Sequence, residues 1–354
     1  MKHINSNQVK LNKAILLSIV GIAFSIAIIV WIVYKIDFVL VRKSFGELKL
    51  YWVVIMVAVY LLGFVIRGVR WHFMLSPIKH VGLRVCTEGV IVGYMANNIL
   101  PARAGELVRA IFVGMRESIS KASVLGTVLV ERVFDGLVMV GILVFCSLFS
   151  RRGSGTDGII GSIILVGCLL FGVAVSIVLV GAKRRTWIET GVVRFMGYFP
   201  EKISKRSIKI SKNLLDSLAF LEGNKNLLVI SILSIFIWCV EGLVFWIGFF
   251  ALRISANLIM AYFILAFVNL WMILPSAPGG LGVFQGGTVL AFSLFGVAPE
   301  IALSYSIVVH LVMILPITLI GLLIINLYGI SIRKIKDHSN LTLNSLTEKF
   351  AGSK

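Results

Sequence analysis

The sequence has few charged residues, and few of these are acidic. Of its 354 residues, 14% are charged and 58% are hydrophobic, and Lys and Arg outnumber Asp and Glu by 34 to 16. A mean hydropathy of +0.99 is more apolar surface than a soluble domain with one core can hide. These scarcities exclude an ordinary soluble protein and predict a membrane protein.

Cysteine is also scarce, and the usual energy-coupling motifs are absent. The four cysteines lie in or beside apolar runs without paired spacing, which argues against a disulfide framework or a zinc site. The sequence contains no G-x-x-x-x-G-K-[ST], and its G-x-G-x-x-G match, at 153–158, lies between two long apolar runs instead of after a predicted strand. We therefore expect no metal, no other cofactor and no ATPase activity.

Long apolar runs are what the sequence has in abundance. A bilayer crossing takes about 20 residues. Runs of about that length or longer recur along the whole chain, at 14–34, 50–66, 121–149, 158–181, 227–252, 257–274 and 300–328. They predict an all-α polytopic membrane protein, with residues 1–354 forming a single integral membrane domain of six to eight transmembrane helices.

The net charge of +18 is concentrated between the apolar runs. We attribute it to contact with anionic lipid at the cytoplasmic face and expect no nucleic-acid partner. The segment 182–226 predicts a basic amphipathic connector on the cytoplasmic side, with a solvated linker as the alternative. Its apolar face holds Ile203, Ile210, Leu214 and Leu221, and its basic face holds Lys202, Lys205, Lys209 and Lys212. Residues 331–354 form a polar tail.

Two sequence landmarks repeat at one offset. "ILPARAG" at 99–105 and "ILPSAPG" at 273–279 lie 174 residues apart, and the same offset aligns Arg67-Gly68 with Glu241-Gly242. Interrupted apolar segments at corresponding positions of two halves indicate a transport site. The repeat halves are expected at approximately 50–181 and 227–328.

The apolar pieces that flank the first break are too short to cross a bilayer, so we expect a re-entrant hairpin there. A second hairpin at 257–296 places both termini on one side, with 24 Lys and Arg on that side and 7 on the other. The positive-inside rule then makes both termini cytoplasmic in the cell membrane, and the hairpins enter from opposite faces as an inverted repeat. Two full crossings at 257–296 remain an alternative.

The breaks predict a site for an anionic group. Pro101 and Pro275 end helices, and helices that begin near Gly105, Gly279 or Gly280 would present free backbone amides. The side chains around the first break are Asn97, Asn98, Arg103, Glu106 and Arg109. The alternative is a plain helix–loop–helix at the membrane interface.

Further charges lie deeper in the apolar runs. Glu131, Arg132 and Asp135 stand about ten residues inside one run, and Glu241 lies in the middle of another. Each such charge costs roughly 2.5–3.5 kcal/mol to insert, so we expect it to be paired or functional. Candidate gating or proton-linked residues are Arg67, Arg70 and His310. The alternatives are a structural ion network, interfacial anchoring and a simple interhelical hydrogen bond.

Four blocks resemble the lysylphosphatidylglycerol synthase transmembrane, or flippase-like, family: "RGVRW" (67–71), "NNILPARAGELVRA" (97–110), "ERVFDGL" (131–137) and "LPSAPGGLGVFQ" (274–285). The resemblance implies a lipid flippase that handles phospholipids or polyprenyl-linked lipids. Family members usually have Glu where Gln285 stands, and commonly an Arg in the last span, where the nearest polar residue here is His310.

We therefore expect a lipid translocator that passes an anionic, aminoacylated or polyprenyl-linked headgroup through a polar cavity between the hairpins. It would not be an enzyme, because the longest extramembrane piece, 182–226, cannot supply an aminoacyltransferase domain. Two alternatives stand: a non-transporting partner of a lipid-modifying glycosyltransferase or synthase, and a membrane enzyme using Glu131 and Asp135 as acid and base. An oligomer is possible under all three.

Overall fold

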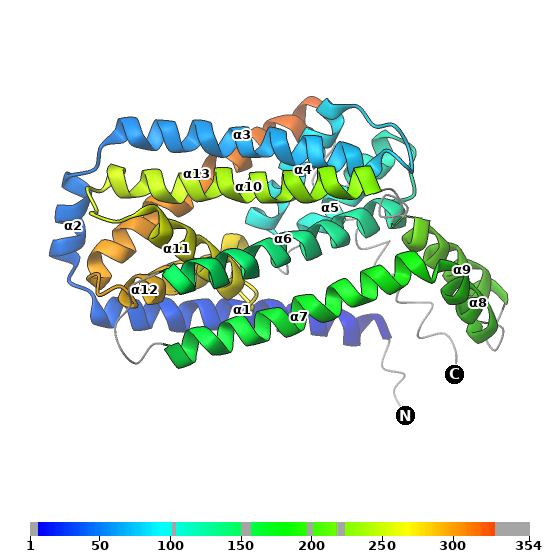
Figure 1. Ribbon diagram of the computed structural model, residues 1–354, viewed down its shortest axis with the longest axis horizontal. Coiled ribbons are helices and arrows are strands. Elements are labelled where there is room, and N and C mark those ends of the chain that lie inside the picture. Colours follow the sequence, from blue (N-terminus) through cyan, green and yellow to red (C-terminus); the bar gives the residue numbers. More distant parts are fainter. Residues whose placement is uncertain are drawn as a thin grey trace.

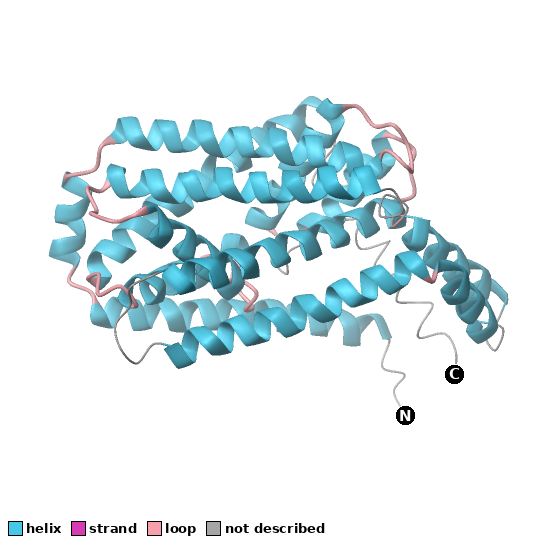
Figure 2. Cartoon of the chain, viewed as in Figure 1, coloured by secondary structure: helices cyan, strands magenta, loops and turns pink. Residues whose placement is uncertain are grey.

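The computed structural model describes residues 6–100, 104–149, 157–196, 201–216, 218 and 224–329. Within these residues the regular elements are all helices (Figure 2), which confirms the predicted all-α class. In chain order they are α1 (Ser6–Lys35), α2 (Phe38–Gly46), α3 (Leu50–Leu75), α4 (Leu83–Ile99), α5 (Gly105–Arg116), α6 (Lys121–Phe149), α7 (Asp157–Lys183), α8 (Arg185–Met196), α9 (Glu201–Asp216), α10 (Asn224–Ala251), α11 (Leu258–Trp271), the 3₁₀ turn η3 (Pro278–Gly280), α12 (Val283–Ser293) and α13 (Pro299–Leu327).

Six of these helices are long enough to cross a bilayer: α1, α3, α6, α7, α10 and α13 have 26 to 30 residues. At 1.5 Å per residue each reaches at least about 39 Å, more than the roughly 30 Å hydrocarbon core. Among the described residues, α3, α10 and α13 also meet the apolar composition of a span, as does α1 together with α2, which bends away from it by 89°. The chain is a polytopic membrane protein.

Four shorter helices form the two hairpins. The arms α4 and α5 have 17 and 12 residues, and α11 and α12 have 14 and 11. None reaches the length of about 20 residues that a crossing needs. The alternative of two full crossings at 257–296 is therefore not supported, and each pair packs as a re-entrant hairpin.

The order α3–α4–α5–α6 recurs as α10–α11–α12–α13. Each helix of the second set begins within four residues of the position that lies 174 residues beyond its counterpart. In Figure 1, α3 and α10 lie side by side in opposite directions, and the hairpins start from opposite ends of the bundle. The sets also exchange partners, because α6 packs on α11 and α13 packs on α4. This reciprocal packing is the arrangement of an inverted repeat.

The tips of the two hairpins meet inside the bundle. A Cβ on Gly279 would lie 3.3 Å from the carbonyl oxygen of Asn98, and the Asn98 side chain donates to Thr318 Oγ1 on α13 at 3.0 Å. Helix α1, which belongs to neither set, covers the second tip: the Ala277 amide donates to Ser25 Oγ at 2.9 Å. The second hairpin is thus held by α1 as well as by its own repeat.

The connector 182–226 differs from the single amphipathic helix that the sequence suggested. It contains two helices, α8 and α9, that pack on each other, and α9 also packs against α6, where Asn213 Nδ2 donates to Ser120 Oγ at 2.8 Å. Trp187 on α8 is 71% exposed. Both helices lie at the end of the bundle where α1 begins and α13 finishes (Figure 1). The tail 331–354, Leu221 and the side chains of Lys202, Ile203 and Leu214 lie outside the described residues.

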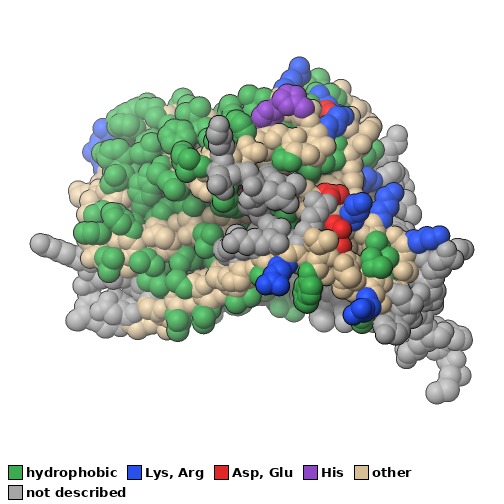
Figure 3. All heavy atoms as spheres, turned by 45° about the vertical axis from the view of Figure 1, so that its right-hand side comes forward, with side chains coloured by type: hydrophobic (Ala, Val, Ile, Leu, Met, Phe, Trp, Pro, Cys, Tyr) green, Lys and Arg blue, Asp and Glu red, His purple; other side chains and the backbone are tan. Residues whose placement is uncertain are grey.

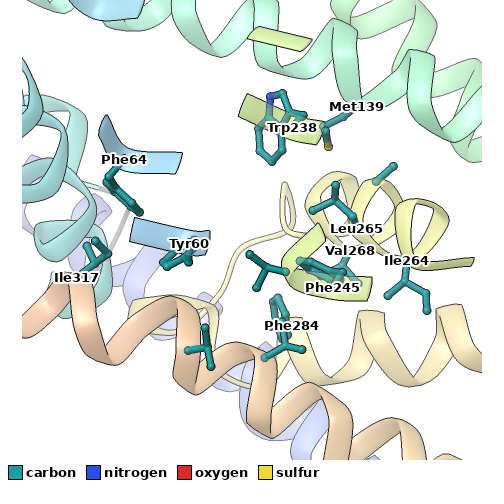
Figure 4. Packing of buried hydrophobic residues seen from close by; sticks show 14 of the residues in the cluster. Tyr60, Phe64, Met139, Trp238, Phe245, Ile264, Leu265, Val268, Phe284 and Ile317 are labelled. Carbon is teal, nitrogen blue, oxygen red and sulfur yellow. The ribbon is translucent and has the colours of Figure 1, made fainter. Parts of the chain in front are cut away.

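On one face of the molecule, charged side chains gather toward one end (Figure 3). Basic and acidic side chains gather at one end of the face shown in Figure 3, and the other end of that face is largely apolar. The interior around the second hairpin is apolar too: Phe245 of α10 faces Val268 of α11 and Phe284 of α12 (Figure 4). Most of the buried charged side chains therefore lie in the half that contains the first hairpin.

The aligned residues Arg67 and Glu241 contact each other. The Arg67 Nη2 donates to Glu241 Oε2 where α3 crosses α10, and both side chains are buried. Phe64, Tyr94 and Trp238 place their rings 5.3–5.5 Å from the Arg67 guanidinium carbon. In a two-fold arrangement only positions beside the axis contact their own counterparts, so this pair marks the axis.

We expect Arg67→Met alone to destabilise the protein by about 3–5 kcal/mol, because Glu241 would remain buried without a cation. Adding Glu241→Leu should recover most of that loss. Thermal unfolding of the purified protein in detergent measures both. If the unfolding temperature of the double variant is no higher than that of Arg67→Met, the two residues are not a coupled pair at the repeat axis.

Candidate functional site

A cluster of five charged side chains lies inside the first repeat, where α3, α5 and α6 meet. Arg109 on α5 binds Glu131 on α6 with both terminal nitrogens, each at 3.0 Å. Arg70 on α3 binds Asp135 with Nη1–Oδ1 at 2.6 Å and Nη2–Oδ2 at 3.3 Å. Arg132 donates to Glu131 and lies 3.5 Å from Asp135. Three arginines thus share two carboxylates.

Helix α10 of the second repeat adds neutral partners to this cluster. Ser234 Oγ accepts from Arg70 at 2.9 Å, and Trp238 Nε1 donates to Asp135 Oδ1 at 3.0 Å. Arg70 also lies 3.3 Å from Glu131, which links the two carboxylates through one guanidinium. Because an unpaired charge in apolar surroundings is costly, these contacts fix the order of α3, α5, α6 and α10.

Aromatic rings cover the guanidinium faces. The Arg109 carbon Cζ lies 3.6 Å from the Trp71 ring centre, and Trp71 itself is fixed by a 3.1 Å hydrogen bond to Thr127 Oγ1. The centre of the Tyr94 ring lies 5.8 Å from Arg132 Cζ. A guanidinium is weakly hydrated and stacks well on aromatic faces, which lowers the cost of placing it here.

The arginines retain donors that nothing in the described structure accepts. The buried Nε–H groups of Arg67, Arg70, Arg109 and Arg132 have no partner among the described residues. Each guanidinium carries five N–H donors, so two carboxylates and one hydroxyl cannot satisfy three arginines. The cluster has spare capacity for a further acceptor.

A small polar pocket adjoins the cluster at the first hairpin. Its cavity volume is about 10 Å³, room for about one water molecule. It is lined by Gly93, Tyr94, Asn97, Gly105, Glu106, Arg109, Val128 and Arg132. The sequence suggested a polar cavity between the two hairpins, but this pocket is small and is lined by α4, α5 and α6 of the first repeat.

The helix start at the first break is already capped. The Gly105 amide donates to Asn97 Oδ1 at 2.7 Å, and Asn97 Nδ2 reaches Glu106 Oε1 at 3.3 Å. The sequence suggested that this amide was free for an anion, but a side chain of the same hairpin occupies it. Pro101 and Arg103 lie outside the described residues.

The second tip forms a chain of neutral hydrogen bonds. The His310 ring contacts the Gly279 carbonyl oxygen through Nε2 and Gln285 Nε2 through Nδ1, both at 2.9 Å. Gln285 Oε1 accepts from the Gly282 amide at 2.8 Å. Gly279 and Gly280 have φ angles of 67° and 75°, which residues with a Cβ rarely adopt. Glu241, Pro275, Gly279, Gly280 and Gln285 therefore do not line the pocket of the first repeat.

One charged group escaped the sequence reasoning. Glu88 on α4 accepts from Arg84, Arg116 and the hydroxyl of Tyr328, and so joins the first hairpin to the end of α13. The position of Arg84 and Glu88 four residues apart on an apolar helix is the signal that could have found it. Ser234 and Trp238 were also missed as partners, because nothing in their local sequence distinguishes them from core residues.

Most of the chain matches one known protein family. The family model described as the lysylphosphatidylglycerol synthase TM region matches residues 18–321. The chain belongs to this family. The matched region includes both hairpins and the ion cluster.

Three relatives illustrate the match. A UPF0104 membrane protein of Methanothermobacter thermautotrophicus is 28% identical over 74% of this chain and 81% of its own length. A UPF0104 membrane protein of Methanocaldococcus jannaschii is 25% identical over 89% of this chain and 94% of its own length. Glycosyltransferase AglD of Haloferax volcanii is 24% identical over 72% of this chain but only 45% of its own length. No solved structure matches this chain.

We expect Gly105→Ala to disrupt the first hairpin. A Cβ at this position would lie 2.0 Å from the Gly93 carbonyl oxygen and 2.5 Å from Asn97 Oδ1, so α4 and α5 must separate. Gly141→Ala on α6 is the matched control, because its Cβ would meet nothing within 4 Å. Unfolding temperature in detergent should fall for the first variant and stay level or rise for the second. Equal stability of the two variants would contradict the close packing at Gly105.

Proposed function

We propose that this protein moves a phosphate-bearing lipid between the two leaflets of the membrane. The headgroup would pass the ion cluster of the first repeat, while acyl or prenyl tails stay in the bilayer. The observation that supports this most directly is the excess of arginine donors over acceptors at the cluster. A lipid phosphate supplies acceptor oxygens that match guanidinium geometry.

Arg132 is the residue best placed to meet the headgroup first. Its side chain is 36% exposed, whereas those of Arg70 and Arg109 are 0% and 3% exposed, and it lines the pocket at the first hairpin. Glu106 lines the same pocket. We propose that Arg132 and Arg109 hold the phosphate and that Glu106 meets a cationic group where the headgroup carries one.

Transport requires the pocket to open, because about 10 Å³ cannot hold a headgroup. Hairpins that enter from opposite ends suit alternating exposure, in which one repeat rocks against the other around a fixed site. The contact between Asn98 and Gly279 would then separate in each cycle. We assign the basic end, which carries α8 and α9, to the cytoplasmic side of the cell membrane.

The substrate class follows from the same chemistry. Anionic, aminoacylated and polyprenyl-linked lipids all present phosphate to a guanidinium. The relative named glycosyltransferase AglD favours a lipid that carries sugar. We propose no group-transfer chemistry for Glu131 or Asp135, because arginines hold both carboxylates, whereas acid–base catalysis needs a carboxyl group that reaches the substrate.

The test is lipid movement in liposomes that contain the purified protein and labelled anionic, aminoacylated or polyprenyl lipids. We expect Arg132→Gln to slow movement by about tenfold or more, because one charge-assisted hydrogen bond is lost. Arg42→Gln on α2 removes the same charge far from the cluster in sequence and should move lipid at the unaltered rate. Folded protein that moves none of the three lipids would rule out the proposal.

A second candidate is a non-transporting partner of a lipid-modifying enzyme. It is favoured by AglD, whose name is that of an enzyme and whose sequence extends well beyond the match. The basic helix α9 would be the docking surface. Lys209→Glu with Lys212→Glu distinguishes the two: loss of a co-purifying enzyme with intact lipid movement supports docking, and Arg132→Gln should then have no effect.

A further inference from the structure

A second cavity lies at the end of the molecule opposite α8 and α9. It has a volume of about 480 Å³ and forms where α3 begins and α10 ends. Its lining residues are Lys49, Tyr51, Trp52, Phe249, Phe250, Arg253, Ile254, Ser255 and Ala256. This volume lies within the usual size of ligand sites, about 300–1,000 Å³.

Two cations line this cavity without partners. Neither the Lys49 ammonium nor the Arg253 guanidinium forms an ion pair or a side-chain hydrogen bond with the part of the chain that the structure describes. The positive-inside count expects only 7 of the 34 Lys and Arg on this side of the membrane. Two of those seven line this one cavity, which indicates an anionic ligand.

Aromatic rings form the other wall. Trp52 stacks on Phe250 with ring centres 5.1 Å apart, and Trp246 packs edge-on against Phe250 at 5.0 Å. The ring centres of Tyr51 and Trp52 lie 5.2 Å apart, and Tyr51 is 54% exposed. Tryptophan and tyrosine with one apolar and one polar side are typical of the headgroup level of a membrane. The ligand is therefore expected to be amphipathic, with an anionic head.

Backbone hydrogen bonds hold the main chain at both cationic residues. The Lys49 amide donates to the Ala251 carbonyl at 2.9 Å, which ties the start of α3 to the end of α10. Arg253 has φ = 53°, a conformation that costs about 1–3 kcal/mol for a residue with a Cβ. The Ile254 amide holds this turn closed on the Phe249 carbonyl at 2.8 Å. A strained arginine on a rigid turn is a feature of binding sites.

We propose that this cavity binds the phosphate of an anionic lipid headgroup, with Lys49 and Arg253 on the phosphate oxygens and Trp52 and Phe250 against the glycerol and upper chain. The site lies in the leaflet at the end away from α8 and α9. It is separate from the ion cluster of the first hairpin, and its occupation at equilibrium does not require lipid movement.

The fluorescence of Trp52 reports directly on lipid binding in this cavity. The protein is placed in phosphatidylcholine nanodiscs that contain bromine-labelled phosphatidylglycerol or, at the same mole fraction, bromine-labelled phosphatidylcholine. The Trp52→Phe variant supplies the signal of the other six tryptophans for subtraction. We expect the phosphatidylglycerol label to quench Trp52 at a mole fraction about tenfold lower than the phosphatidylcholine label, as for a ligand with one additional charged contact.

The variants Lys49→Gln and Arg253→Gln, combined, should abolish that preference. Arg42→Gln with Lys43→Gln, on the neighbouring α2, removes the same charge outside the cavity and should preserve it. Equal quenching by both labels in the unaltered protein overturns the proposal, and so does a preference that survives in the cavity variant. The first of these outcomes does not require the cavity variant to fold.

Added inorganic phosphate separates two sources of the ligand. If millimolar phosphate leaves the quenching unchanged, the site takes a lipid headgroup as proposed. If phosphate displaces the lipid label, the anion site stands and serves a soluble phosphate as well. Because binding is measured without transport, a protein that binds here but moves no lipid would contradict the proposed function alone.

Discussion

The burial of charge in an apolar bundle constrains this structure more than any other interaction. A guanidinium or carboxylate that leaves water must be paired, and breaking such a pair costs about 3–5 kcal/mol. Arg70, Arg109 and Arg132 therefore determine where Glu131 and Asp135 can lie, and these contacts set the positions of α3, α5 and α6. Apolar packing alone would tolerate other rotations of these helices, because lipid tails are as apolar as leucine.

The two repeats share a scaffold but not its chemistry. Helices α12 and α13 begin 178 residues after α5 and α6, and at that offset the charged positions of the first repeat are matched by apolar or neutral ones: Arg109 by Gly287, Glu131 by Val309, Arg132 by His310 and Asp135 by Met313. Tyr305 lies buried among Phe249 and Phe292. One half thus has a charged interior, and the other is largely aromatic with neutral hydrogen bonds. The duplication supplies opposed hairpins, while the candidate site belongs to one of them.

Much of this arrangement could be predicted from the sequence, for physical reasons. A proline and glycines inside an apolar run interrupt a helix at their own positions, so the sequence predicted hairpins at 99–105 and 273–279. The offset that relates them also aligned Arg67 with Glu241, which the structure places in contact. The membrane class followed from composition alone.

The partners of each charge could not be predicted in the same way. Periodicity records which side of a helix is buried, but it does not say what that side meets. Arg70 and Asp135 are 65 residues apart, and Trp238, which completes the site, is 103 residues from Asp135. Closure of the pocket also depends on how these side chains fill space together. For the same reason the sequence could not show that Asn97 would occupy the helix start at Gly105.

The second tip shows how the asymmetry between repeats is maintained. The Gly279 carbonyl can only accept, so His310 Nε2 must carry the proton, and Nδ1 is then left to accept from the Gln285 amide. Gln285 Oε1 in turn accepts from the Gly282 amide. Every group in this chain is used once with a neutral imidazole, and a second proton on the ring would leave two donors facing each other. A glutamate at 285 would instead favour a charged histidine, so Gln285 keeps the tip of the second hairpin uncharged.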